Sequence, residues 1–163
     1  MKKFVTWQCL PSFLTPNKFS LGSNYAGQAY TLIMSKFTHL HTHSHYSLLD
    51  GLTKLDTMVD IAKKAGMPAI ALTDHGNMYG AIEFYKLAKK AGIKPIIGVE
   101  AYVTSGSRKE KSTETGQRRY NHLILLAKNL QGYKNLIRLV TIANLEGYYY
   151  KPRMDKEILR EFH

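Results

Sequence analysis

Two consecutive segments of this chain carry the same pattern, and that repeat constrains the fold more than any other feature. Residues 53–66 and 82–92 each have apolar side chains at helical spacing, and each ends in Lys-Lys-Ala-Gly. A short apolar run follows each segment, at residues 68–73 and 95–99. Because continuously apolar strands are typical of parallel sheets covered on both faces, the repeat predicts an α/β fold with helices between parallel strands.

The helix boundaries follow from local signals. Thr53 can cap the first helix, with Asp56 at the third helical position as in a capping box, and Gly66 and Gly92 are expected to end the two helices. Apolar periodicity predicts a further helix over residues 133–145. The expected buried stripes are Leu55, Met58, Val59, Ala62 and Ala65 in the first helix, Ile82, Tyr85, Ala88 and Ala91 in the second, and Leu136, Ile137, Val140 and Asn144 in the third.

Ionisable side chains follow the expected strands. Asp74 and His75 come directly after the first apolar run, Glu100 comes directly after the second, and His122 leads a third run at residues 123–127. The carboxyl ends of parallel strands meet at one edge of a sheet, where α/β proteins collect ligands and chemistry. We therefore expect Asp74 and Glu100 on the same edge.

Histidines form the second strong pattern. Four of the seven histidines lie at every second position of residues 39–45. Alternate residues of an extended segment share a face, so we expect His39, His41, His43 and His45 on the same side. A lone His-x-His is weak evidence, but a spacing of about 7 Å along a strand lets His41 and His43 reach one metal ion or two neighbouring ions.

The combined set of side chains predicts a metal cluster. Imidazoles and carboxylates without a nearby cysteine suit Zn²⁺, Mn²⁺ or Fe²⁺. With Asp50 and the groups at the strand ends included, the potential ligands exceed the four that a single tetrahedral ion needs. We expect two or three ions, which clamp attacking and leaving oxygens and supply metal-bound hydroxide as the nucleophile. This chemistry indicates hydrolysis of phosphate esters, with the catalytic side chains unassigned.

Several side chains near this cluster keep alternative roles. His39 is expected to orient a ligand or to hold a carbonyl group rather than to ligate. Asp74 can ligate a metal, or it can fix the His75 ring from behind. We expect His45 to be exposed beyond the site, and we interpret Ser47 as the end of the extended segment.

The charge balance favours a polyanionic partner. The chain has 23 Lys and Arg against 12 Asp and Glu, a formal net charge of +11. Residues 105–119 form either a plain solvated loop or a contact to a phosphate backbone. The candidate DNA-binding residues in this loop are Arg108, Lys109, Lys111, Arg118 and Arg119.

The first 33 residues differ in kind from the rest. Residues 1–33 contain no acidic residue and no clear periodicity. We expect them to be a poorly ordered N-terminal extension, followed by the N-terminal part of a domain at residues 34–163. No apolar run approaches the roughly 18 residues of a membrane span, and the single Cys9 fits a reducing compartment. These features predict a soluble, cytoplasmic protein.

The chain from Met34 to His163 resembles the polymerase and histidinol phosphatase (PHP) domain almost without a gap. The version it resembles is the one at the N-terminus of bacterial DNA polymerase III alpha subunits. The blocks that carry the resemblance are Phe37–Gly51, Ala71–Ala81, Gly92–Glu100, Asn121–Leu123 and Gly147–Arg153.

The resemblance implies a distorted (β/α)7 TIM-like barrel with a metal cluster at its mouth. It also implies a 3′–5′ exonuclease-type site within a DNA-synthesising enzyme that uses Mg²⁺ at a separate polymerase site. The implied partners are DNA, a proofreading exonuclease subunit and a sliding clamp. By motif position it assigns metal ligation to His41, His43, Asp50, His75, Glu100 and His122, with Asp74 as a close neighbour.

The sequence departs from the family pattern in three respects. Residues 1–33 have no counterpart in it, and His45 stands where the family usually has an acidic residue. The chain also ends before a later His or Cys, a terminal Asp-x-His pair and the polymerase palm, fingers and thumb. We therefore expect a fragment of the barrel, truncated at the C-terminus. By itself this fragment is expected to be inactive, without polymerase activity and with weak metal binding at most. A free-standing PHP-family phosphatase and a catalytically silent PHP scaffold stay open as alternatives.

Overall fold

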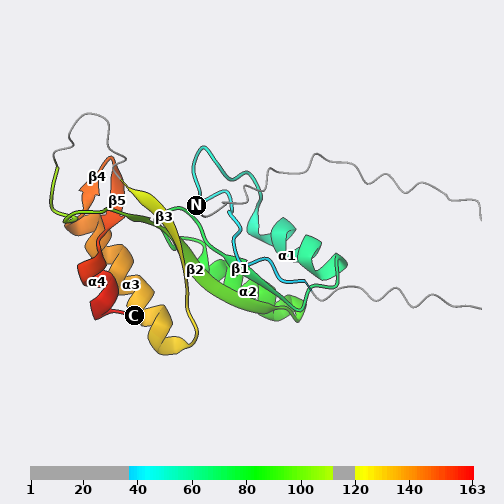
Figure 1. Cartoon of the computed structure of the whole chain (residues 1–163). Coiled ribbons are helices and arrows are strands. Elements are labelled where there is room, and N and C mark those ends of the chain that lie inside the picture. Colours follow the sequence, from blue (N-terminus) through cyan, green and yellow to red (C-terminus); the bar gives the residue numbers. More distant parts are fainter. Residues whose placement is uncertain (1–36, 112–119) are drawn as a thin grey trace, which may run out of the picture. The chain divides into compact units, whose positions relative to one another are not determined.

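The computed structural model describes residues 37–111 and 120–163. The expectations for residues 1–33 and for the domain boundary at Met34 fall outside these ranges and stay predictions. Within the described ranges, no helix is both long enough and apolar enough to cross a membrane. In chain order the elements are α1 (Leu55–Lys64), β1 (Ala69–Leu72), α2 (Ala81–Ala91), β2 (Lys94–Val103), β3 (Asn121–Leu126), α3 (Leu130–Leu145), β4 (Tyr148–Tyr149), β5 (Lys151–Met154) and α4 (Lys156–Glu161), as Figure 1 shows.

Strand β2 is the centre of the sheet. Along one edge it pairs in parallel first with β1, then with His75 through a single bridge opposite Glu100, and finally with β5. Along its other edge it pairs with β3 in antiparallel register, so that Tyr102 lies opposite both His122 and Arg153. The α/β fold and the parallel β1–β2 pair predicted from the repeat are confirmed. The second strand was predicted to end before Glu100, but β2 continues to Val103, so Glu100 lies within the strand, beside the residues that follow β1.

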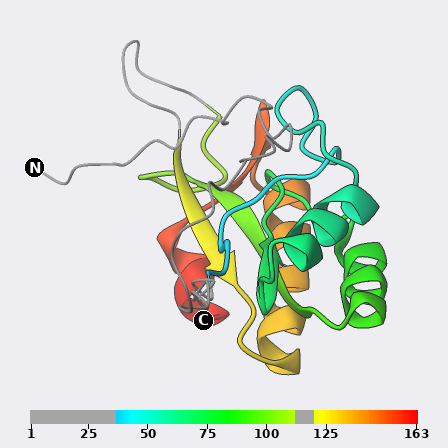
Figure 2. The ribbon, with the colours of Figure 1, turned by 90° about the vertical axis from the view of Figure 1, so that its right-hand side faces the viewer.

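The two faces of β2 have different functions. Val99 and Ala101 point into a core that is shared with α3, β5 and α4, whereas the residues between and after them, Glu100 and Tyr102, point to the opposite face. A second core joins α1, α2 and β1 around the fully buried Phe84, and Figure 2 shows these two helices side by side. The helices therefore support the strands from outside and leave Glu100 free to face the site.

The glycine stops were predicted correctly and the helix start was not. Gly66 and Gly92 end their segments with φ of +68° and +79°, which glycine adopts without strain. Helix α1 begins at Leu55, its N-cap Lys54 has no side-chain hydrogen bond, and Asp56 accepts a hydrogen bond from the Thr57 amide. The capping box is therefore absent, because the helix starts too late for Thr53 to serve as its cap.

The predicted buried stripes of all three helices need correction. Ala65, predicted in the first stripe, and Asn144, predicted in the third, are exposed. In α2 the side chains facing the core are Ala81, Phe84 and Ala88, while Ile82 and Tyr85 are 56% and 50% exposed. Both sets have helical spacing, and burial of the large Phe84 ring against the core decides between them. In α3 the buried residues are Leu136, Leu139 and Ala143, and Ile137 is 43% exposed.

Residues 39–42 run along β1 but do not form a regular strand. The amides of Ala71 and Thr73 donate to the carbonyl groups of His39 and Thr42. The step from Ala71 to Thr73 is two residues, whereas the step from His39 to Thr42 is three. This mismatch breaks the strict alternation expected for residues 37–46. For this reason His39 does not lie with the other histidines.

Candidate metal centre

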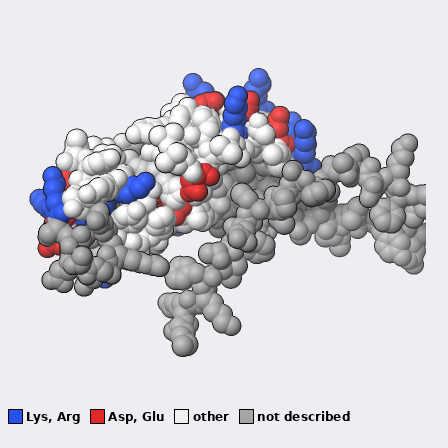
Figure 3. All heavy atoms as spheres, turned by 90° about the horizontal axis from the view of Figure 1, so that it is seen from above, with Lys and Arg blue, Asp and Glu red and all other residues white. Residues whose placement is uncertain are grey.

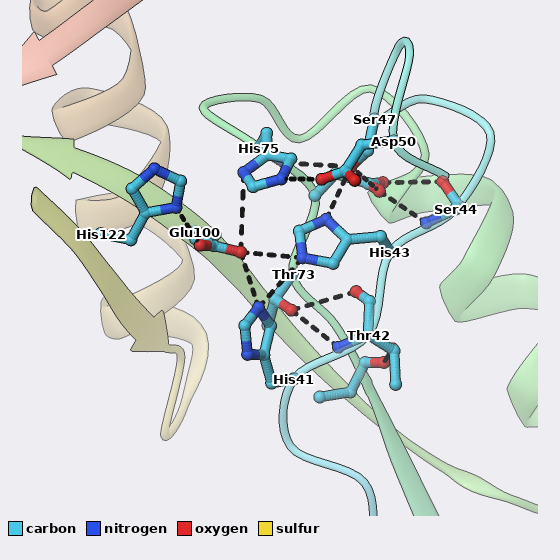
Figure 4. A network of polar contacts seen from close by, with 12 residues as sticks. His41, Thr42, His43, Ser44, Ser47, Asp50, Thr73, His75, Glu100 and His122 are labelled. Atoms are coloured by element: carbon cyan, nitrogen blue, oxygen red, sulfur yellow. Dashed lines mark hydrogen bonds and ion pairs between the residues drawn. The ribbon is translucent and has the colours of Figure 1, made fainter. Parts of the chain in front are cut away.

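The carboxylate of Glu100 is the hub of the site. It is 4% exposed on the inner face of β2, and its Oε2 lies 2.6 Å from Nε2 of His41 and 2.8 Å from Nε2 of His43. Its Oε1 contacts Nδ1 of His122, which β3 brings in from the opposite edge. Burial raises the pKa of Glu100, but hydrogen bonds from His43, His122 and His41 outweigh burial and hold the pKa far below its usual range. Figure 4 shows the imidazoles arranged around this carboxylate.

His75 and Asp50 complete the cluster. His75 follows β1, and its bridge to Glu100 sets the ring beside the hub. Its Nε2 contacts Oδ2 of Asp50, whereas its buried Nδ1 lies 3.6 Å from Oε2 of Glu100 and has no hydrogen-bond partner among the described residues. Burial lowers the pKa of His75, although Asp50 and Glu100 oppose the shift. A neutral ring, which metal binding requires, is therefore favoured.

A tight turn brings Asp50 to this point. The carbonyl of Ser47 accepts hydrogen bonds from the amides of Asp50, at 3.0 Å, and Gly51, at 2.8 Å. A Cβ at Gly51 would lie 2.1 Å from the carbonyl oxygen of Ser44, so only glycine allows the chain to close here. Between them, Leu49 adopts a φ of +69°, a conformation that is strained for leucine.

An aromatic side chain backs the cluster. Tyr102 is 5% exposed and stacks against His75 at 5.8 Å with an interplanar angle of 15°. It also meets the edges of His122, at 5.1 Å, and Tyr120, at 4.8 Å. Burial, helped by the nearby Tyr120, Glu100 and Asp50, raises the pKa of Tyr102 to about 12, so the ring supports the ligands as a neutral phenol.

The donor set fits divalent metal ions. Three groups each have ligand atoms within 4.8 Å of one another: His41 with His43 and Glu100, His43 with Asp50 and His75, and His75 with Glu100 and His122. The groups share members, so the ions they hold would be neighbours. Among the described residues, Nδ1 of His75 has no hydrogen-bond partner, so this atom is free to bind a metal ion. The imidazole and carboxylate ligands suit Zn²⁺, Mn²⁺ or Fe²⁺.

All six residues expected to be ligands thus lie together, whereas His39, His45 and Asp74 lie outside the three ligand groups. The exposed His39 packs edge-on against Phe37 at 4.7 Å, and the exposed His45 lies 4.3 Å from the ring of Tyr46. Neither belongs to the three ligand groups. The carboxylate of Asp74 contacts Ser44 and Ser47 of a turn and belongs to none of the three ligand groups. Neither of its two predicted roles, metal ligation or fixing the His75 ring, is therefore seen among the described residues.

Sequence reasoning missed the part that these serines play. Ser44 and Ser47 are buried, at 0% and 1% exposure, and both bind Asp74. Serine is common in turns and carries no signal of its own. The only available hint was their spacing of three residues immediately after the His-x-His pair.

The residues of the loop expected to bind DNA differ in their exposure. Arg108 must be corrected: it is 8% exposed, and its guanidinium binds Glu146, Asp155 and Glu157, so it cannot reach a phosphate backbone. Lys109 and Lys111 are exposed, while residues 118 and 119 lie outside the described ranges. On the face in Figure 3, Lys and Arg gather mainly towards two ends and do not form one continuous basic tract.

Comparisons with known proteins identify the family. Residues 39–163 match the family model described as "PHP domain". The DNA polymerase III subunit alpha of Borreliella burgdorferi is 58% identical over 129 residues, which cover 78% of this chain and 11% of that protein. The subunit of the same name from Aquifex aeolicus is 52% identical over 135 residues, covering 79% of this chain and 12% of that protein. The chain therefore spans about a tenth of the length of these relatives.

A solved structure covers part of the same region. An amidohydrolase from Chromobacterium violaceum, with bound sulfate and no metal, is 26% identical with a TM-score of 0.43, covering 63% of this chain and 32% of that one. The family assignment itself rests on the match over residues 39–163 and on the sequence identities above 50%. From this match and the α/β sheet described above, we conclude that the chain belongs to the PHP domain family.

Proposed function

We propose that this chain is the N-terminal part of the PHP domain of a bacterial replicative DNA polymerase, and that its histidine and carboxylate cluster hydrolyses phosphodiester bonds at the 3′ ends of DNA. The polymerase assignment is supported by the names of the relatives that match at 52% and 58% identity. The hydrolytic role is supported by the composition of the cluster. A cytoplasmic location follows from this role.

The observation that carries the proposal is the sharing of residues between the three ligand groups. His43, His75 and Glu100 each belong to two of them. A single structural ion needs only four protein ligands and has no open coordination position. Adjacent ligand groups that share residues are instead suited to two or three ions. Adjacent divalent ions polarise phosphoryl oxygens and lower the pKa of water.

The chain's own residues define what this site can do. Glu100 places one negative charge between the imidazoles of both sheet edges and so offsets the charge of the cations. Asp50 is 60% exposed in its side chain, on the open side of the cluster, and orients the His75 ring through Nε2. The opposite side is closed by Tyr102, so a phosphate group approaches from the side of Asp50.

Contacts to DNA beyond the site are proposed for the exposed Lys109 and Lys111. Lys109 also lies 3.8 Å from Glu146, a weak exposed pair that a phosphate can replace. The resemblance further suggests a proofreading exonuclease subunit and a sliding clamp as partners, with Mg²⁺ at a polymerase site outside this chain.

The test is a comparison of substrates on the purified polymerase that carries this chain, loaded in turn with Zn²⁺, Mn²⁺ or Fe²⁺. We expect release of nucleotides from a 3′-labelled single strand, with two or three ions in the cluster by elemental analysis. His43→Ala removes a member of two of the three ligand groups, so it should hold at most one of these ions and should lose the release of nucleotides. His45→Ala, a neighbouring exposed histidine outside the three ligand groups, is the matched control and should change neither.

The other outcomes are equally informative. Hydrolysis of a small phosphate ester such as histidinol phosphate, without action on DNA, would replace the proposal with a phosphatase. Metal binding without hydrolysis of either substrate, or no metal binding, would leave a scaffold.

A further inference from the structure

Asp74 is a buried carboxylate next to the ligand residue His75, yet it belongs to none of the three ligand groups. It lies two residues after β1, is 1% exposed, and accepts three hydrogen bonds. Its Oδ1 accepts from the Ser44 amide and from the Ser47 hydroxyl, both at 2.7 Å, and its Oδ2 accepts from the Ser44 hydroxyl at 2.8 Å. Asp74 thus ties the turn at residues 44–47 to the end of β1.

The hydroxyl of Ser47 connects this carboxylate to two ligand residues. It donates its only proton to Asp74, accepts a hydrogen bond from the His75 amide at 3.1 Å, and lies 2.8 Å from Nδ1 of His43. Because a hydroxyl has one proton and that proton is already used, Nδ1 of His43 must be the donor in the last contact. Figure 4 shows Ser47 beside the His43 ring.

The direction of these hydrogen bonds places a proton on Nδ1 of His43. A metal ion can then bind the ring only through Nε2, in place of the hydrogen bond that Nε2 makes to Glu100 in the metal-free chain. That atom faces the cluster, 3.0 Å from Nε2 of His41 and 2.8 Å from Oε2 of Glu100. Had Ser47 donated to His43 instead, the lone pair would lie on the wrong side of the ring for a ligand.

We propose that Asp74 and Ser47 are positioning residues that set the tautomer and orientation of His43 for metal binding. This inference rests on the proposed metal site. Partners that hold the second ring nitrogen of a histidine commonly orient metal ligands, and their loss costs about 10–100-fold in metal affinity. Here the carboxylate acts at one remove, through a serine that also binds the backbone of the next ligand, His75.

The direct readout is the tautomer of His43 in the metal-free chain, from long-range ¹H–¹⁵N spectra, with the signals assigned by their loss in His43→Ala. In the unmodified 163-residue chain Nδ1 should be protonated. In Ser47→Ala the ¹⁵N shifts should show loss of the Nδ1 proton, with Nε2 keeping its proton beside Glu100. The affinity for Zn²⁺, measured by competition with a chromophoric chelator, should fall about 10–100-fold.

Ser44→Ala is the matched control. It also removes one hydroxyl donor from Asp74, but that hydroxyl binds Oδ2 and does not contact His43. We expect a similar change in the midpoint of urea unfolding for both serine variants, with the tautomer and the Zn²⁺ affinity altered only in Ser47→Ala. A purely structural role for the turn predicts the same Zn²⁺ affinity and the same His43 tautomer in the two variants.

Asp74→Asn provides a rescue. The Oδ1 position receives an amide and a hydroxyl proton, so the oxygen of asparagine takes that place and keeps the acceptor for Ser47. The Nδ1 proton of His43 should therefore persist in Asp74→Asn and be lost in Asp74→Ala. If Asp74→Ala does not fold, Ser47→Ala decides the question.

The two proposals fail in different ways. An unchanged tautomer and an unchanged Zn²⁺ affinity in Ser47→Ala would overturn the positioning role and leave the metal site in place. Failure of the unmodified chain to bind Zn²⁺, Mn²⁺ or Fe²⁺ would overturn the proposed function and the positioning role together.

Discussion

Glu100 and Arg108 are both buried charges surrounded by ionisable side chains, but their surroundings differ in kind. Arg108 is enclosed by carboxylates: Nη1 lies 3.1 Å from Asp155 and 3.0 Å from Glu157, while Nε and Nη2 lie 3.0 and 2.7 Å from Glu146. Each guanidinium nitrogen therefore has an oxygen partner. Glu100 is enclosed by imidazoles, and Nδ1 of His75 has no partner within the described ranges.

The difference separates a structural cluster from a binding site. Around Arg108 each guanidinium nitrogen is already paired with a carboxylate oxygen, so a ligand would have to break existing ion pairs. Around Glu100 the ring nitrogens outnumber the carboxylate oxygens they face, and the surplus lone pairs are suited to cations. A count of charged residues alone would rank the two clusters equally.

The largest expected effect is on metal binding. Glu100→Gln removes the negative charge shared by His41, His43 and His122, and the amide presents protons to rings that need their lone pairs free. Loss of a side chain that only orients a ligand costs up to about 100-fold in metal affinity. Because Glu100 is itself a proposed ligand, we expect the affinity for Zn²⁺ to fall by at least about 100-fold. Chelator competition measures it, with Asp60→Asn on the exposed side of α1 as control. Equal affinities in Glu100→Gln and Asp60→Asn would remove Glu100 from the centre of the account.

At the Arg108 cluster we expect a loss of stability without a loss of metal affinity. Arg108→Met keeps the buried stem but leaves Asp155, whose side chain is 5% exposed, without its cation. Breaking a buried pair in this way costs about 3 kcal/mol of unfolding free energy. Urea unfolding of the metal-free chain measures the loss, and Zn²⁺ affinity should stay as it is in the parent. A loss of metal affinity with unchanged stability would contradict the distinction.

Much of this comparison was visible in the sequence, and part of it was not. The position of Asp74 and His75 after a parallel strand could be predicted, because apolar runs and glycine stops define parallel strands. Glu100 was predicted at the end of the second strand, but β2 continues to Val103 and Glu100 lies within it. The role of Arg108 could not be predicted, because its three partners lie 38, 47 and 49 residues further along the chain. A loop rich in Ser, Gly and Lys gives no sign that one of its basic side chains is buried.

The site shows the same limit on a smaller scale. His41 and His43 were expected together from alternation, and the two do converge on Glu100. His39 was expected on the same face, but the three-to-two match between residues 39–42 and β1 breaks the alternation. Hydrogen-bond register with another segment decided this, and register is a property of the folded pair of segments.

A third prediction concerns pH. Burial raises the pKa of Asp155, but hydrogen bonds from the amides of Arg108 and Ile158 and from the Arg108 side chain lower it below the ordinary value of 3.8. Because the folded-state pKa is the lower one, the contribution of Asp155 to stability is complete above about pH 4 and is lost as the pH falls through the folded-state pKa.

The stability difference between Asp155→Asn and the parent should therefore shrink as the pH falls from 5 to 3, as followed by urea unfolding at each pH. A difference that stays constant over this range would show that Asp155 is not held as a charged partner of Arg108.

The smallest effect is expected for the exposed basic residues of the same loop. Lys111→Ala should weaken single-stranded DNA binding uniformly across sequences, and should reduce the dependence of log K on log salt by roughly one charge. Fluorescence anisotropy at several salt concentrations measures both. Arg108→Met, whose side chain is already paired, should leave the salt dependence unchanged, and the opposite ranking would move the DNA contact to Arg108.

We propose that the side chains around Glu100 form a site for adjacent divalent ions. Equilibrium dialysis of the chain against an excess of Zn²⁺, Mn²⁺ or Fe²⁺, followed by elemental analysis, measures how many ions it holds. We predict two or three ions per chain, falling to one or none in Glu100→Gln. A chain that retains no metal under any of the three conditions, or that retains the same number of ions in Glu100→Gln, would contradict it.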